Sequence, residues 1–127
     1  MTDPALSIEG VWVPWRLDIE LKIASFNNPA FERALRRVTK PHKRRIATGD
    51  IDDEVLESLS KESVAKLLLL DWKNVQGEDG KDIPYSWEKA LEFFNDERTK
   101  QLYRDVIAIS RDHSLFMAQD EEDDRGN

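Results

Sequence analysis

The segment Leu17-Asp-Ile-Glu-Leu-Lys-Ile23 alternates apolar and charged residues with a period of two. This alternation is typical of an antiparallel strand that buries one face and leaves the other face in water. Upstream, Val11-Trp-Val13 is a shorter run of strand-favouring residues, and Pro14 separates the two runs because proline cannot donate to a sheet ladder. The sequence therefore predicts a small N-terminal antiparallel β-hairpin or meander.

A helix is predicted directly after these strands. Asn28 is a favourable N-cap, and Pro29 suits the first helical position, where its missing N–H is not needed. The apolar residues that follow recur at the spacing of one helix face: Phe31, Ala34, Leu35 and Val38. Pro41 is expected to end this helix, because the residue before a proline avoids the α-helical region.

Helices are also predicted over much of the remaining chain. Between residues 52 and 72 the apolar face changes direction, so either the helix breaks near Ser60 or its second half is buried on several sides; we favour a break or bend near Ser60. Ser86 is expected to cap a further helix, and Asp96 the last one. The last helix is predicted to carry one continuous stripe: Leu102, Tyr103, Val106, Ile109, His113 and Phe116.

The predicted fold class is α+β and mostly helical, with a small N-terminal antiparallel β-hairpin or meander followed by about four to five helices. Residues 1–119 are expected to form a single domain, because a chain of 127 residues is close to the common domain size. Residues 120–127 begin with five consecutive carboxylates, which cannot pack together, so we expect a disordered acidic tail there.

Composition excludes several functional classes. The chain has no Cys, which removes disulfide scaffolds, thiolate zinc sites and cysteine nucleophiles. Its longest apolar run is Leu67–Leu70, far shorter than the roughly 20 residues that a membrane span needs. Met1-Thr-Asp-Pro4 lacks the basic and apolar pattern of a signal peptide, so we expect a cytoplasmic protein with no membrane partner.

No catalytic, cofactor-binding or metal-binding residues are predicted. The segment Gly77-Glu-Asp-Gly-Lys81 lacks the spacing of a phosphate-binding loop, and the acidic residues around it lack the spacing of a calcium loop. His42 and His113 stand alone, whereas metal sites need clustered ligands. We therefore expect a protein without enzymatic activity and without a cofactor.

The strongest local charge feature is basic, because seven Lys and Arg residues fall between residues 33 and 45 and no acid follows Glu32 until Asp50. This cluster could contact an acidic protein patch or the chain's own acidic tail, form a plain solvated surface, or bind a nucleic-acid backbone. The pI of about 4.9 and the net charge of −7 disfavour nucleic acid, since a negative chain repels a polyanion at long range.

Large aromatic residues are the second kind of candidate for partner contact. Phe93 and Phe94 are adjacent on a predicted helix and cannot both face one core, so one of them is free to meet a partner. Trp87 at the start of that helix is the other candidate. The predicted protein-contact residues are therefore Arg36, Arg37, Lys40, Lys43, Arg44, Arg45, Trp87 and Phe93.

Several segments, in their order and spacing, resemble one protein family. They are Gly10-Val-Trp-Val13, Leu21-Lys-Ile-Ala24, Asn27-Asn-Pro-Ala-Phe31, Leu35 to Pro41, and Leu68-Leu-Leu-Asp-Trp-Lys-Asn-Val-Gln-Gly-Glu-Asp-Gly-Lys-Asp-Ile-Pro-Tyr-Ser86. Together, between Gly10 and Phe116, they are similar to the tail assembly chaperones of long-tailed bacteriophages and their prophage relatives. The basic cluster and the acidic tail depart from that family's pattern.

The resemblance implies a non-catalytic protein that acts in the cytoplasm of the bacterial host and is absent from the mature virion. Its implied partners are the tape measure protein, whose hydrophobic helices it would keep from aggregating, and the tail-tube protein; a homo-oligomer is also expected. Two other hypotheses stay open. One is a structural tail component that remains in the virion, and the other is a small nucleic-acid-binding regulator that uses the basic cluster of residues 33–45: Arg36, Arg37, Lys43, Arg44 and Arg45.

Overall fold

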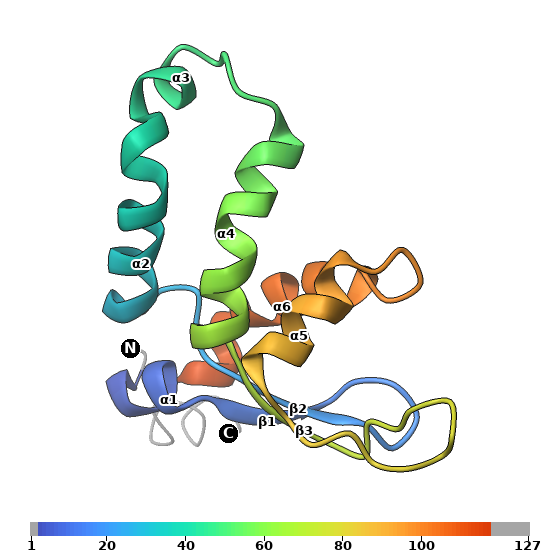
Figure 1. Ribbon diagram of the computed structural model, residues 1–127. Helices are drawn as coiled ribbons and strands as arrows, with labels where there is room; N and C mark the ends of the chain where they lie inside the picture. Colours follow the sequence, from blue (N-terminus) through green and yellow to red (C-terminus); the bar gives the residue numbers. More distant parts are fainter. Residues whose placement is uncertain (1–2, 118–127) are drawn as a thin grey trace.

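The computed structural model describes residues 3–117, in which helices pack against a three-stranded sheet (Figure 1). The strands are β1 (Val11–Pro14), β2 (Glu20–Ile23) and β3 (Leu69–Lys73). The helices are α1 (Pro4–Glu9), α2 (Pro29–Thr39), α3 (Lys43–Ala47), α4 (Asp53–Leu67), α5 (Trp87–Asn95) and α6 (Gln101–Ser110), with 3-10 helices η1 (Lys40–His42) and η2 (His113–Phe116). The predicted α+β, mostly helical class with an N-terminal hairpin is confirmed. The acidic tail predicted for residues 120–127 lies outside the described residues.

The sheet is antiparallel, with the strand order β1-β2-β3. Val13 pairs with Leu21, which also pairs with Trp72, and these buried side chains share the inner face of the sheet. The sequence analysis predicts helix where β3 lies, and this prediction is wrong. The aliphatic run Leu67–Leu70 suits a buried strand as well as a helix, and pairing with β2 decides between the two.

The strand predicted from Leu17 begins only at Glu20. Leu17 is 99% exposed and has a φ of +53°, because it lies in a tight turn. The turn is closed by the Trp15 N–H, which donates to the Ile19 carbonyl at 2.9 Å. The alternation of apolar and charged residues therefore extends upstream of the strand, into a turn in which the Leu17 side chain is exposed.

α2 and α4 stand side by side and project away from the sheet, joined at their far ends by η1 and α3 (Figure 1). We call this projection, residues 29–67, the arm. The Asn28 side-chain oxygen accepts a hydrogen bond from the Phe31 N–H at 2.9 Å, which confirms the predicted N-cap. α2 ends before Pro41, as predicted, and η1 and α3 follow it, because proline is tolerated in the first turn of a new helix.

α4 is continuous through Ser60, so the favoured break is wrong. The Ser60 hydroxyl donates back to the Leu56 carbonyl at 3.1 Å, so it bonds to the backbone of the helix without interrupting it. The consecutive residues Ser63, Val64 and Ala65 are all buried, because α2, α5 and β3 pack around this half of the helix. The second interpretation, burial on several sides, is the one confirmed.

The C-terminal stripe is interrupted, because α6 ends at Ser110 and η2 follows it. Phe116 is fully buried as predicted, whereas His113 is exposed and does not belong to the stripe. Asp96 does not cap α6: it is the C-cap residue of α5, and its carboxylate accepts the Arg98 N–H at 2.8 Å in the turn before α6. No helix within residues 3–117 has both the length and the apolar character needed to cross a membrane.

Candidate polypeptide-binding surface on the arm

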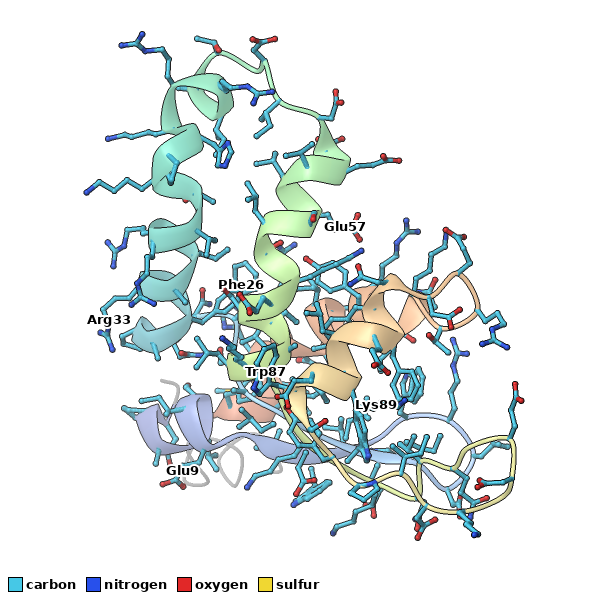
Figure 2. All side chains as sticks on the ribbon, in the orientation of Figure 1. Glu9, Phe26, Arg33, Glu57, Trp87 and Lys89 are labelled. Atoms are coloured by element: carbon cyan, nitrogen blue, oxygen red, sulfur yellow. The ribbon has the colours of Figure 1, made fainter. Side chains whose placement is uncertain are left out.

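The six basic residues predicted as contacts are all exposed along one continuous stretch of the arm. Arg36 and Arg37 belong to α2, Lys40 to η1, and the other three to α3, namely Lys43, Arg44 and Arg45. Basic side chains extend from these helices into solvent in Figure 2. Within residues 3–117 none of the six forms an ion pair, so their charges are available to a partner.

Part of this charge has a local structural role. Arg36 and Arg37 lie in the last turn of α2, where cations interact favourably with the negative end of the helix dipole. Asp53 and Glu54 lie in the first turn of α4, where the opposite charge is favourable. The two helices therefore carry opposite charges at the ends that η1 and α3 connect.

An apolar hollow of about 390 Å³ lies where α2, α4 and α6 meet. We call it the arm groove. Its floor is formed by buried Phe31 and Val64, and half-buried Leu35, Leu56 and Ile107 form its walls. The full lining is Phe26, Phe31, Leu35, Thr39, Leu56, Ser60, Val64, Tyr103, Arg104, Ile107 and Arg111.

Aromatic and arginine side chains form the base of the arm groove. The Phe26 and Phe31 rings lie 5.1 Å apart between centroids, and the Arg111 guanidinium carbon lies 4.5 Å from the Phe26 centroid. Figure 2 places Phe26 between the lower ends of α2 and α4. Arg104 and Arg111 are both exposed, so the α6 side of the groove carries positive charge above an apolar floor.

The polar groups inside the arm groove are satisfied. The Tyr103 hydroxyl lies 3.0 Å from the Ser60 hydroxyl, and burial raises the pKa of Tyr103 above its ordinary value even though this bond acts in the opposite direction. Thr39 donates to the Leu35 carbonyl at 2.8 Å. The groove is therefore not lined by reactive unpaired groups, and its chemistry is that of an apolar contact surface.

A second hollow, of about 510 Å³, adjoins the arm groove at Thr39, which lines both. We call it the tip pocket, and its lining is Arg36, Thr39, Lys40, Lys43, Ile46 and Ala47. Three of the predicted contact residues therefore meet in one place. Arg37 instead lines a separate hollow on the α4 side with Val38, and Arg44 and Arg45 line neither the groove nor the tip pocket.

The structure does not bring the two aromatic candidates to the arm groove. Trp87 is half-buried at the start of α5, with the Lys66 ammonium 4.3 Å from its ring centroid. Phe93 is half-buried against Trp72, at 5.6 Å between ring centroids, while Phe94 is fully buried. Of this adjacent pair, Phe93 is therefore the more accessible ring.

Several groove residues carry no local signal in the sequence. Phe26 lies in a loop, and Arg104 and Arg111 belong to no basic cluster in the sequence, so only the packing of distant segments places them together. The apolar stripe of α2 predicts that Phe31 and Leu35 face inward, but it does not predict which residues they contact. Within residues 3–117, no three His, Cys, Asp or Glu side chains are placed to hold a metal ion.

The fold and this surface define a small α+β protein that carries an apolar groove with basic rims on a helical arm. A family model described as YdaY prophage protein matches residues 26–127, which include the whole arm. The chain belongs to this family and is a prophage-derived protein. No curated protein and no solved structure matches it.

Proposed function

We propose that this prophage protein is a non-catalytic tail assembly chaperone, which binds the tape measure protein during tail morphogenesis. The observation that carries the proposal is the arm groove, an accessible apolar surface between three helices. A protein that holds aggregation-prone helices needs such a surface, bordered by charge that keeps the complex soluble. The resemblance of Gly10 to Phe116 to tail assembly chaperones supports the same function, and the family match supports a prophage origin.

The net charge of −7 suits this role, because a strongly charged holder keeps its complex dispersed. Tail-tube subunits are proposed as a second partner, and self-association as the means of holding a long client at several points. The site of action is proposed to be the cytoplasm of the bacterial host. Mass spectrometry should then detect none of this chain in purified phage particles. Its presence in stoichiometric amounts would indicate a structural tail component.

Co-expression with the tape measure protein of the same prophage tests the proposal. We expect the tape measure protein to move from the insoluble to the soluble fraction and the two chains to elute together in size-exclusion chromatography. Unchanged solubility together with separate elution would refute the proposal. An unrelated acidic protein of similar size serves as the control for a general effect of co-expression.

A nucleic-acid-binding regulator is the second candidate, and one observation favours it. The six predicted basic residues are exposed and free of ion pairs within residues 3–117, which is what phosphate contacts require. Titration against duplex DNA at about 50 mM salt, where counterion release is most favourable, tests this candidate. Absence of binding at that salt concentration removes it.

A further inference from the structure

The arm groove and the tip pocket form one path along the arm. They share Thr39, and together they follow α2, η1 and α3 from Phe31 to Ile46. The eleven residues of α2 alone rise by about 16 Å, at 1.5 Å per residue. Three turns of a bound helix have the same length, since each turn rises about 5.4 Å.

The backbone around this path leaves no place for a bound strand. α2 and α4 satisfy their N–H and C=O groups internally, so an extended peptide would find no free ladder between them. Side chains of Leu35, Leu56 and Ile107 form the walls instead. An apolar trough between two helices is the kind of surface that accepts the apolar stripe of a third helix.

Both rims of the path are basic. Arg36, Lys40 and Lys43 lie on the α2–α3 side, and Arg104 and Arg111 lie on the α6 side. All five are exposed, and no carboxylate is among the described residues that line either hollow. A positive path on a chain with a net charge of −7 selects a ligand with negative flanks.

We propose that the arm groove and the tip pocket together bind an amphipathic helix of about three turns, which has one apolar stripe and acidic residues on both flanks. This inference deepens the proposed function, because such a helix would be the segment of the client that the chaperone holds. Negative charge alone is not enough for a ligand to bind here, because the lining of the arm groove is mostly apolar. Residues 120–124 of this chain offer five carboxylates but no apolar stripe, so they match the rims and not the floor.

Binding of designed peptides to the full chain, measured by fluorescence anisotropy, tests this inference. The probe is a helical peptide of about 11 residues, or three turns, with Leu at i, i+3, i+4 and i+7 and Glu on both flanks. One comparison peptide has Lys in place of every Glu, and a second has the sequence of residues 117–127 of this chain. We expect the Glu-flanked peptide to bind at least about tenfold more tightly than either of the others.

A matched pair of charge-reversal variants locates the site. K40E/K43E changes two residues that line the tip pocket, whereas R44E/R45E makes the same change in the same helical region at residues that line neither hollow. We expect the first variant to weaken binding of the Glu-flanked peptide about tenfold and the second by less than about threefold. Circular dichroism confirms that both variants fold.

Three results would overturn the inference: equal binding of the Glu-flanked and Lys-flanked peptides, equal binding of the 117–127 peptide, or equal effects of the two variants. NMR shift perturbations that leave Leu35, Thr39 and Ile107 unchanged would also overturn it. If the peptides fail to bind while the tape measure protein is still made soluble by the chain, the proposed function stands and the client uses another surface. If the peptides bind and the tape measure protein stays insoluble, the groove is confirmed and the proposed function fails.

Discussion

Arg111 lies over the ring of Phe26, with its guanidinium carbon 4.5 Å from the ring centroid. The Phe26 N–H also donates to the Ser110 carbonyl at 2.9 Å, so the end of α6 is fixed to the loop that precedes α2 at two points. Phe26 in turn packs against Phe31 in the first turn of α2. This contact therefore links the base of the arm to α6 at one end of the arm groove.

Removal of either partner should destabilise the base of the arm. We expect F26A to lower the free energy of unfolding by about 2–3 kcal/mol, since a half-buried ring and its contact with Phe31 are lost. R111A should cost about 0.5–1 kcal/mol, the usual value of an exposed cation–π contact. Urea unfolding of both single variants and the double variant checks this. Strict additivity would show that the two side chains are not coupled.

Asn28 should be one of the most sensitive polar positions. Its side-chain oxygen accepts the Phe31 N–H, its amide donates to the Ser25 carbonyl, and the side chain is only 2% exposed. N28A therefore leaves buried backbone groups without partners, and we expect a loss of about 2 kcal/mol. The adjacent exposed Asn27 is the matched control, and N27A should change stability by less than about 0.5 kcal/mol. Equal losses in the two variants would contradict the capping role.

Tyr85 should make the fold sensitive to alkaline pH. Its hydroxyl donates to the Ala65 carbonyl at 2.8 Å and also to the Leu69 carbonyl; burial, with Asp71 and Glu88 nearby, raises the pKa of Tyr85 to about 12. Since the unfolded-state pKa is about 10, the stabilisation is complete below pH 10 and is lost as the pH rises towards 12.

Urea midpoints measured between pH 9 and pH 12 check this expectation for Tyr85. Y85F removes the titrating hydroxyl, so its midpoint should fall less steeply than that of the wild type over this range. The raised pKa of Tyr103 contributes in the same direction, which makes Y85F/Y103F the variant with the smallest slope. Parallel curves for the wild type and both variants would mean that neither phenol is linked to folding.

Local chemistry in the sequence predicts part of this fold well. Asn28 and Ser86 are identified as caps because their side-chain oxygens bond to N–H groups three residues ahead, an interaction that needs no tertiary context. β3 is missed because Leu69 and Leu70 fit a strand or a helix equally well, and only the pairing of Ile23 with Leu69 resolves them. The prediction that the strand begins at Leu17 is wrong because Leu17 lies in a tight turn, although the alternation of apolar and charged residues includes it.

The sequence predicts only one side of the candidate site, the basic rim formed by α2 and α3. A run of basic residues marks the α2–α3 rim, and three of its members line the tip pocket. The base and walls of the arm groove combine Phe26, Leu56 and Ile107, which are far apart in the sequence. No periodicity connects such residues, because their proximity comes from the packing of α4 against α2 and of α6 against α4.

The most direct test of the account uses neighbouring residues of α4 in the co-expression assay. Leu56 lines the arm groove, whereas Val55 is 38% exposed and lines none of its surface. L56D should leave the tape measure protein in the insoluble fraction, and V55D should keep it soluble and in complex, with both variants folded by circular dichroism. Retention of the client by L56D at the wild-type level would contradict the claim that this groove holds it.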